Sequence, residues 1–224
     1  MNLKNVLRRI ELYRKARSNN LLAIDDFCDK VCPATEFLRF IEGMKAKKEI
    51  KLEARKHFVI SCVSGMELYF KKIIIVFVNS GWVHERFLTY IKQDKVTLAD
   101  IYEIEKNRIS LGEIISVTYS FQNLDSINRI MSEMFGIRDF ISEIKNYRLN
   151  IEEDDEDSLN IVLQEDYPDF YKKISELVEL RNIIVHHMGP RRLGLNRVSE
   201  MYDNLCAFMT VADDYILGKI PIEE

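Results

Sequence analysis

Apolar residues recur at steps of three and four along most of the chain, which is the spacing of a helix face. The longest such pattern runs from Glu49 to Asn79 and includes Val59, Met66 and Phe70. A helix of this length spans roughly 46 Å at 1.5 Å per residue. Ser80-Gly81 follows it and suits a helix end. The pattern predicts one long arm of an antiparallel helical bundle.

The remaining segments predict shorter helices. Residues 3–30 fit two helices with a break near 18–20, and Pro33 fits the start of another. Several short helices are expected over 84–150, although the β-branched and aromatic stretch 114–121 fits a helix or a strand. The short helix after Pro33 has an apolar face made of Phe37, Leu38, Ile41 and Met44.

The C-terminal part predicts two strong helices. The first follows Pro168, with Asp166 as its candidate N-cap, and Gly189-Pro190 ends it. The second covers about 198–217. With only eight glycines and four prolines in 224 residues, we expect an all-α protein that folds as a single domain over 1–224.

Charge and cysteine content narrow the function. The net charge of −4 argues against a generally basic nucleic-acid coat, but six consecutive acidic residues, 152–157, account for the excess. We expect that run to be an exposed loop. Cys28 and Cys32 have helical spacing, but no second pair of metal ligands follows, so no metal or cofactor is expected. No leader or membrane segment is found, and the prediction is a cytoplasmic protein.

Arg181 departs from the pattern of its helix. The apolar stripe Ile174, Leu177/Val178, Ile184/Val185 places it at the centre of an otherwise apolar face. Burying an unpaired guanidinium is costly, so Arg181 must have a partner, or this face must open onto a polar cleft.

Further polar residues lie nearby. Asn182 and His186 are four residues apart and share a helix face, and His187 adjoins them in the last turn. A bridged core arginine and a histidine helix cap would explain the same residues without a function. The basic residues that follow are suited to a phosphate-bearing ligand; they are Arg191, Arg192 and Arg197.

The segment Leu180-Arg181-Asn182-Ile183-Ile184-Val185-His186-His187 resembles the motif of the HEPN (higher eukaryotes and prokaryotes nucleotide-binding) family. That motif is an arginine, a polar residue and then a histidine, and Arg181, Asn182 and His186 match it with four residues between Arg181 and His186. The resemblance implies a HEPN-type helical bundle whose core covers about 49–80 and 165–217. Additional N-terminal helices and an insertion at about 84–164 would elaborate it.

The resemblance also implies an activity. Many HEPN proteins are metal-independent ribonucleases that act as toxins or antiphage effectors, so RNA is the expected substrate. Arg181, Asn182, His186 and Glu67 become candidate catalytic residues, with Glu67 on the long helix either orienting His186 or pairing with Arg181. The candidate substrate-binding residues are His187, Arg191, Arg192 and Arg197.

Geometry predicts that the site is shared between two chains. On a straight helix Arg181 and His186 lie roughly 140° apart, so one helix cannot easily direct both at one phosphate. We expect a homodimer through the motif-bearing helix, with Leu180 and Ile183 in the interface, and a controlling antitoxin or regulatory protein. The alternative is a non-catalytic HEPN module that serves binding or assembly in a defence or regulatory complex.

Overall fold

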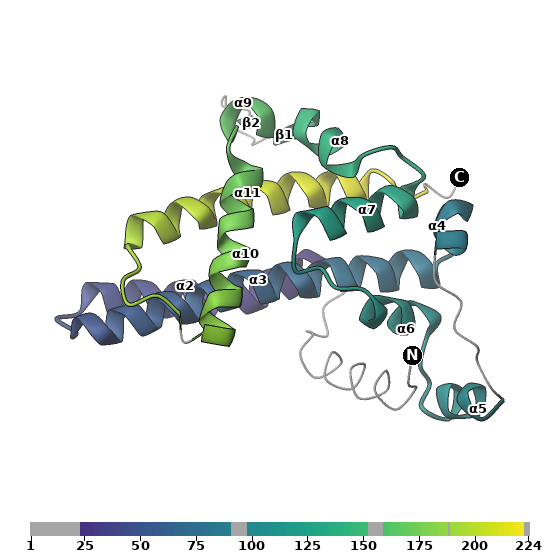
Figure 1. The fold of residues 1–224 in the computed structure, drawn as a ribbon. Helices are drawn as coiled ribbons and strands as arrows, with labels where there is room; N and C mark the ends of the chain where they lie inside the picture. Colours follow the sequence, from purple (N-terminus) through teal and green to yellow (C-terminus); the bar gives the residue numbers. More distant parts are fainter. Residues whose placement is uncertain (1–22, 91–97, 152–158, 188, 222–224) are drawn as a thin grey trace.

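The computed structural model describes residues 23–90, 98–151, 159–187 and 189–221, and their regular structure is helical apart from one small hairpin (Figure 1). The all-α prediction is therefore confirmed. Of the predicted segments, the first N-terminal helix and the acidic run lie outside the described residues. The helices are α2 (Ala23–Gly43), α3 (Lys48–Asn79), α4 (Glu85–Tyr90), α5 (Leu98–Lys106), α6 (Leu111–Thr118), α7 (Leu124–Phe135), α8 (Phe140–Asn146), α9 (Leu163–Asp166), α10 (Phe170–His187) and α11 (Leu195–Leu217). The strands are β1 (Arg148–Ile151) and β2 (Leu159–Val162).

The long helix α3 is the centre of the fold, and it matches the predicted arm closely. Helices α2, α6, α10 and α11 all pack against it, so it is buried on several faces. Val59, Met66 and Phe70 are fully buried in its middle. It ends as expected, with the Ser80 N–H bonded to the Val76 carbonyl, the Gly81 N–H bonded to the Val78 carbonyl, and Gly81 at φ 74°.

Pro33 does not begin a helix, as the sequence had suggested, but lies inside α2. Proline lacks the N–H that a helix interior uses, and this costs about 3 kcal/mol. Burial outweighs that cost, because Phe27, Val31, Ala34 and Leu38 form one continuous face against α3 on both sides of the proline. The apolar face predicted after Pro33 is only partly buried, since Phe37 and Met44 are exposed.

The stretch 114–121, which fitted a helix or a strand, belongs to helix α6 as far as Thr118, where the helix ends. Ser110 and Glu113 make a capping box at its start, in which each side chain bonds the other's backbone N–H. Gly112 lets the helix approach α3 closely, because a Cβ there would lie 2.8 Å from the Ile75 backbone. The Gly112 N–H also donates to Asn79 Oδ1 at 3.0 Å. Local capping and this close contact favour the helix over the strand.

The hairpin β1–β2 was not predicted. Its strands pair antiparallel, with Arg148 opposite Val162 and Ile151 opposite Leu159. Leu149 and Ile161 are directly opposed, and Leu149 is buried in the main core. Four residues per strand are too few for an alternating pattern to stand out in a helical sequence.

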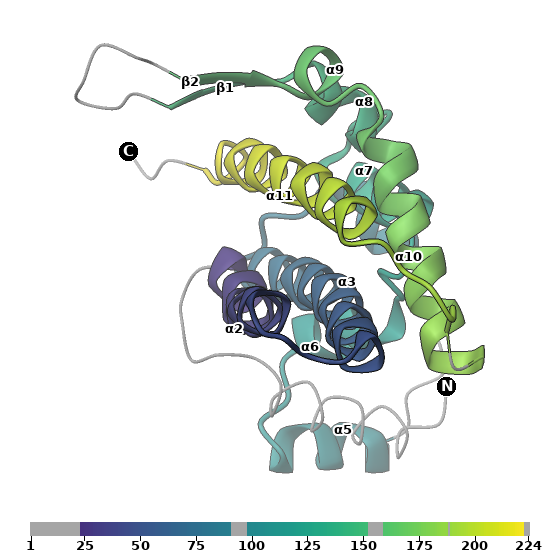
Figure 2. The same ribbon diagram turned by 90° about the vertical axis from the view of Figure 1, so that its left-hand side faces the viewer.

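The motif-bearing helix α10 crosses the α3 axis steeply, and α11 runs back along the bundle (Figures 1 and 2). Asp166 is not the N-cap of α10: it belongs to α9, where its carboxylate accepts the Val162 N–H at 2.8 Å. Pro168 lies in the turn before Phe170, the first residue of α10. The end of α10 and the last helix fall where predicted, within three residues.

Candidate functional site

Helix α10 carries Arg181 from the core towards the surface. Its first three turns bury Phe170, Ile174, Leu177 and Leu180. The apolar stripe continues beyond Arg181 only in part, because Ile184 packs against the core whereas Val185 is 49% exposed. Leu180 is only 6% exposed, so the prediction that it forms part of a dimer interface is wrong. Ile183, Val185, His186 and His187, in the last turns of the helix, are exposed to solvent.

Glu67 on α3 and Arg181 on α10 face one another where the two helices cross. The Glu67 Oε1 atom lies 3.7 Å from Arg181 Nη2, and the two side chains are 14% and 15% exposed. Glu67 therefore pairs with Arg181, which is one of the two roles left open for it. This ion pair gives the half-buried guanidinium the partner that its position requires.

The hydrogen bonding of this pair is incomplete. Arg181 Nη1 donates to Asn182 Oδ1 at 3.0 Å, whereas the buried atoms Arg181 Nε and Glu67 Oε1 have no hydrogen-bond partner among the described residues. Buried polar atoms in proteins nearly always have a hydrogen-bond partner, so these two are exceptions. The pair is thus held mainly by charge, and Arg181 retains N–H donors that no acceptor in the described part of the chain uses.

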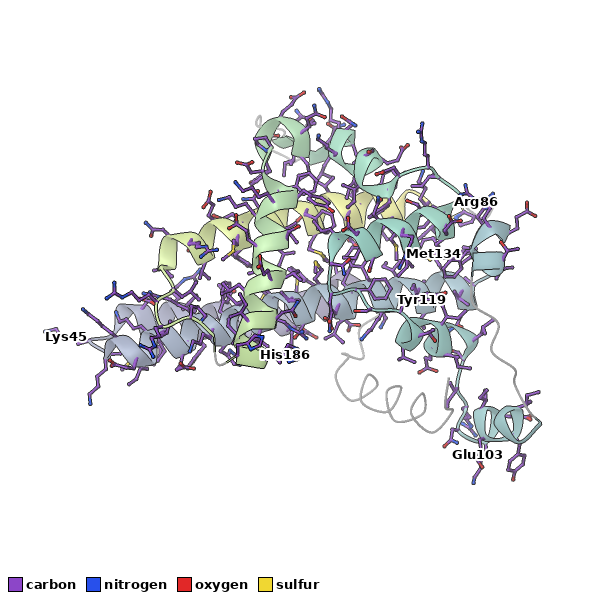
Figure 3. The ribbon with its side chains drawn as sticks, viewed as in Figure 1. Lys45, Arg86, Glu103, Tyr119, Met134 and His186 are labelled. Carbon is purple, nitrogen blue, oxygen red and sulfur yellow. The ribbon has the colours of Figure 1, made fainter. Side chains whose placement is uncertain are left out.

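His186 and His187 form the exposed last turn of α10 (Figure 3). Gly189 turns the chain there at φ 71°, and its N–H bonds the Ile183 carbonyl at 3.2 Å. A Cβ on Gly189 would lie 2.9 Å from Ile184 Cγ1 and 3.3 Å from Lys56 Cε, so the turn fits closely against α3. Within the described part of the chain no hydrogen bond or ion pair joins His186 to Arg181 or Glu67.

The three arginines that follow α10 separate into two groups. Arg191 and Arg192 are exposed and line a cavity of about 740 Å³. Arg197 lies elsewhere, with Nη2 3.5 Å from Glu176 Oε2 on an earlier turn of α10. The predicted cluster of three is therefore a pair, and Arg197 belongs to a surface ion pair.

The cavity also contains basic residues to which the sequence analysis gave no role: Lys48, Lys51 and Arg55, all on the first turns of α3. The signal was visible as a concentration of lysine and arginine over 45–56. It was not connected with Arg191 and Arg192 because about 140 residues separate the two segments in the sequence.

Three further properties of the described residues concern metal ligands, membrane-spanning helices and cysteines. No three His, Cys, Asp or Glu side chains in them are grouped in a way that would bind a metal ion. None of the helices there combines the length and the apolar composition that crossing a bilayer requires. The four cysteines are free, and Cys28 and Cys32 lie exposed on α2.

Comparison of the sequence with known proteins shows the family to which the chain belongs. No curated protein and no solved structure matches the chain. A family model described as RiboL-PSP-HEPN matches residues 34–218, and these bounds enclose α3, α10, α11 and the segment between them. The matched range covers most of the sequence, so the chain belongs to the HEPN family, of the RiboL-PSP-HEPN type.

Proposed function

We propose that the protein is a metal-independent endoribonuclease that acts as a toxin or antiphage defence effector. The observation that carries the proposal is the Glu67–Arg181 pair. It holds a guanidinium with unused donors, at 15% exposure, five residues before an exposed histidine. Membership of a family whose members are often ribonucleases adds support. An arginine fixed by a carboxylate and a nearby imidazole are the groups that phosphodiester cleavage needs.

The reaction is an attack of the RNA 2′-hydroxyl on the adjacent phosphorus. The 2′-oxygen loses its proton and bonds to phosphorus, and the bond from phosphorus to the 5′-oxygen breaks. The products are a 2′,3′-cyclic phosphate and a 5′-hydroxyl, which takes up a proton. His186 transfers one of these protons. Arg181 neutralises charge on the phosphorane oxygens, Asn182 orients the guanidinium through its Oδ1, and Glu67 holds it in place.

The site is completed by a second copy of the chain. Arg181 turns inward to Glu67 while His186 is exposed, which agrees with their separation of roughly 140° around the helix. A twofold axis near the end of α10 would bring His186 of one protomer towards Arg181 of the other. Ile183 and Val185, which are 38% and 49% exposed, offer this interface apolar surface next to the motif.

A ribonuclease of this kind must be restrained in the cell that makes it. We therefore include in the proposal a controlling protein partner, either an antitoxin or a subunit that releases activity during infection.

The test is RNA cleavage by the purified chain in the presence of a chelator. We expect fragments that end in a 2′,3′-cyclic phosphate, and we expect His186→Ala to abolish them. His57→Ala is the matched control, since His57 is also an exposed histidine but lies on α3 beside Phe37. His186 is exposed, so its loss should leave the fold intact, which circular dichroism will show. Full cleavage by His186→Ala would overturn the proposal.

A further inference from the structure

The basic cavity lies where the chain from α10 to α11 passes over the start of α3. Five cationic side chains line it, from two segments far apart in the sequence, together with the single carboxylate of Glu49. Its volume of about 740 Å³ lies in the range of ligand-binding cavities. Such a concentration of one charge is unusual in a chain whose net charge is −4. The cationic side chains are those of Lys48, Lys51, Arg55, Arg191 and Arg192.

Two of these cations build the cavity rather than serve a ligand. Arg55 donates from Nη1 to the Leu193 carbonyl at 2.6 Å and from Nε to Glu42 Oε1 at 2.7 Å. Lys51 Nζ donates to the Glu42 carbonyl at 2.7 Å. These bonds fasten the end of α2 and the segment after α10 to α3, and they fix the wall that carries Arg191 and Arg192.

The other three cations are available to a ligand. Lys48, Arg191 and Arg192 are exposed, and no hydrogen bond or ion pair to them is found within the described residues. Their self-repulsion is a cost to the folded state, which a bound anion would remove. Arginine forks and lysine ammonium groups are the usual partners of phosphate oxygens.

We propose that this cavity binds backbone phosphates of the RNA strand that extends from the cleavage site; the inference rests on the proposed function. The turn at Gly189, between His186 and Arg191, lies against Lys56, which is the neighbour in sequence of Arg55 in the cavity wall. The cavity is therefore close to the exposed end of α10, where a strand that leaves His186 can reach it. None of the described residues that line the cavity is an aromatic residue on which a base would stack, and the apolar ones are Leu52 and Leu193. The contact is therefore with phosphates, and it adds affinity without reading sequence.

The test measures RNA binding at several salt concentrations. A fluorescent single-stranded RNA is titrated with the non-cleaving His186→Ala protein, and then with the same protein carrying Lys48→Ala and Arg192→Ala. The matched control carries Arg86→Ala and Lys106→Ala, which remove two exposed cations far from the cavity. Each lost phosphate contact should lower the slope of log K against log salt by about 0.7 to 1.

We expect a smaller slope and weaker RNA binding for the cavity variant, equally for RNAs of different sequence, and a much smaller effect for the control. Equal slopes in all three proteins would overturn the inference. So would a cavity variant that loses binding of ATP or of a polyglutamate peptide but keeps its RNA affinity, since the cavity would then serve a free nucleotide or an acidic protein. Cleavage by the native chain is scored separately, so failure of the proposed function and failure of this inference are distinguishable.

Discussion

Glu67 and Arg181 meet across the crossing of α3 and α10, with Oε1 3.7 Å from Nη2 and neither atom in a hydrogen bond with the other. Glu67→Gln keeps the shape of the side chain and removes its charge. We expect the protein to remain folded and kcat for RNA cleavage to fall about tenfold to a hundredfold, because a guanidinium displaced by a fraction of an ångström no longer meets the phosphorane. Single-turnover kinetics with saturating protein will measure this.

Glu67→Ala should lower the stability of the protein more than Glu67→Gln does. It leaves the charge of Arg181 largely buried without a counterion, which we expect to lower the free energy of unfolding by about 2–3 kcal/mol. Urea unfolding of the two variants separates the roles. If Glu67→Gln keeps full activity, the carboxylate serves only the fold.

A site shared between two copies makes a prediction about mixtures. Under the proposed function, Arg181→Ala and His186→Ala proteins should each be inactive, but their heterodimer would contain one pairing in which both residues are native. Random exchange of subunits should restore about a quarter of the native activity, since half of the dimers are mixed and each has one of its two sites intact. Activity that stays absent after exchange, shown to be complete by mass spectrometry, would place both residues in one protomer's site.

The exposed end of α10 should control association without controlling folding. Ile183→Glu combined with Val185→Glu puts charge on surface that the dimer would bury, and we expect monomers that remain folded. Leu180→Ala is the contrasting variant, because Leu180 is buried within one protomer. It should cost about 2–4 kcal/mol of stability. Analytical ultracentrifugation will measure association and urea unfolding will measure stability. A double glutamate variant that stays dimeric would contradict this interface.

Stability should depend on pH through Glu42. The hydrogen bond from Arg55, aided by the charges of Arg55 and Lys51 and opposed by burial, holds the pKa of the Glu42 carboxyl below its usual value. A lowered folded-state pKa gives stability that is present above the pKa of the unfolded chain, about 4.3, and is lost as the pH falls through the folded value. Glu42→Gln should therefore reduce stability near neutral pH and have little effect in acid. Urea unfolding of both proteins between neutral pH and acid tests this prediction. If Glu42→Gln lowers the free energy of unfolding equally at all pH values, the stability is not linked to the pKa of Glu42.

Pro33→Ala should stabilise the protein. The alanine restores a helix N–H in the middle of α2, and the exposed proline ring contributes little packing. We expect a gain of about 1–3 kcal/mol, reduced somewhat because alanine gives the unfolded chain more freedom. Thermal unfolding will measure it. Pro168→Ala, in the turn before α10, is the control and should give no gain.

Much of the fold could be predicted from the sequence because the long helices carry continuous apolar faces. Helices α3, α10 and α11 appear within three residues of the expected bounds. The residues that were misplaced depend on tertiary contacts. Pro33 is tolerated inside a helix because α3 covers the other face of α2, and Leu180 is buried because α10 tilts across α3 rather than running along it.

The residues of the candidate site likewise include some that could be predicted from the sequence and others whose position depends on tertiary contacts. Pairing of Glu67 with Arg181 was one of two roles predicted for Glu67, because a stripe arginine needs a counterion and the family resemblance indicated the helix that could supply it. The lysines and arginine of the first turns of α3 were overlooked, since nothing local to 48–55 relates them to Arg191 and Arg192. The separation of Arg197 was equally hidden, because it depends on how α11 passes Glu176 on α10.

The end of α10 lies at the edge of the fold, outside the core that keeps one chain folded (Figure 2). A single chain can then fold before it pairs, and the extent of pairing depends on the protein concentration. Under the proposed function the dimer is the active species. At low protein concentration, the concentration of dimer increases with the square of the total protein concentration. A cell could hold the folded chain harmlessly below a threshold and raise its activity steeply by a modest increase in synthesis, before any partner protein intervenes.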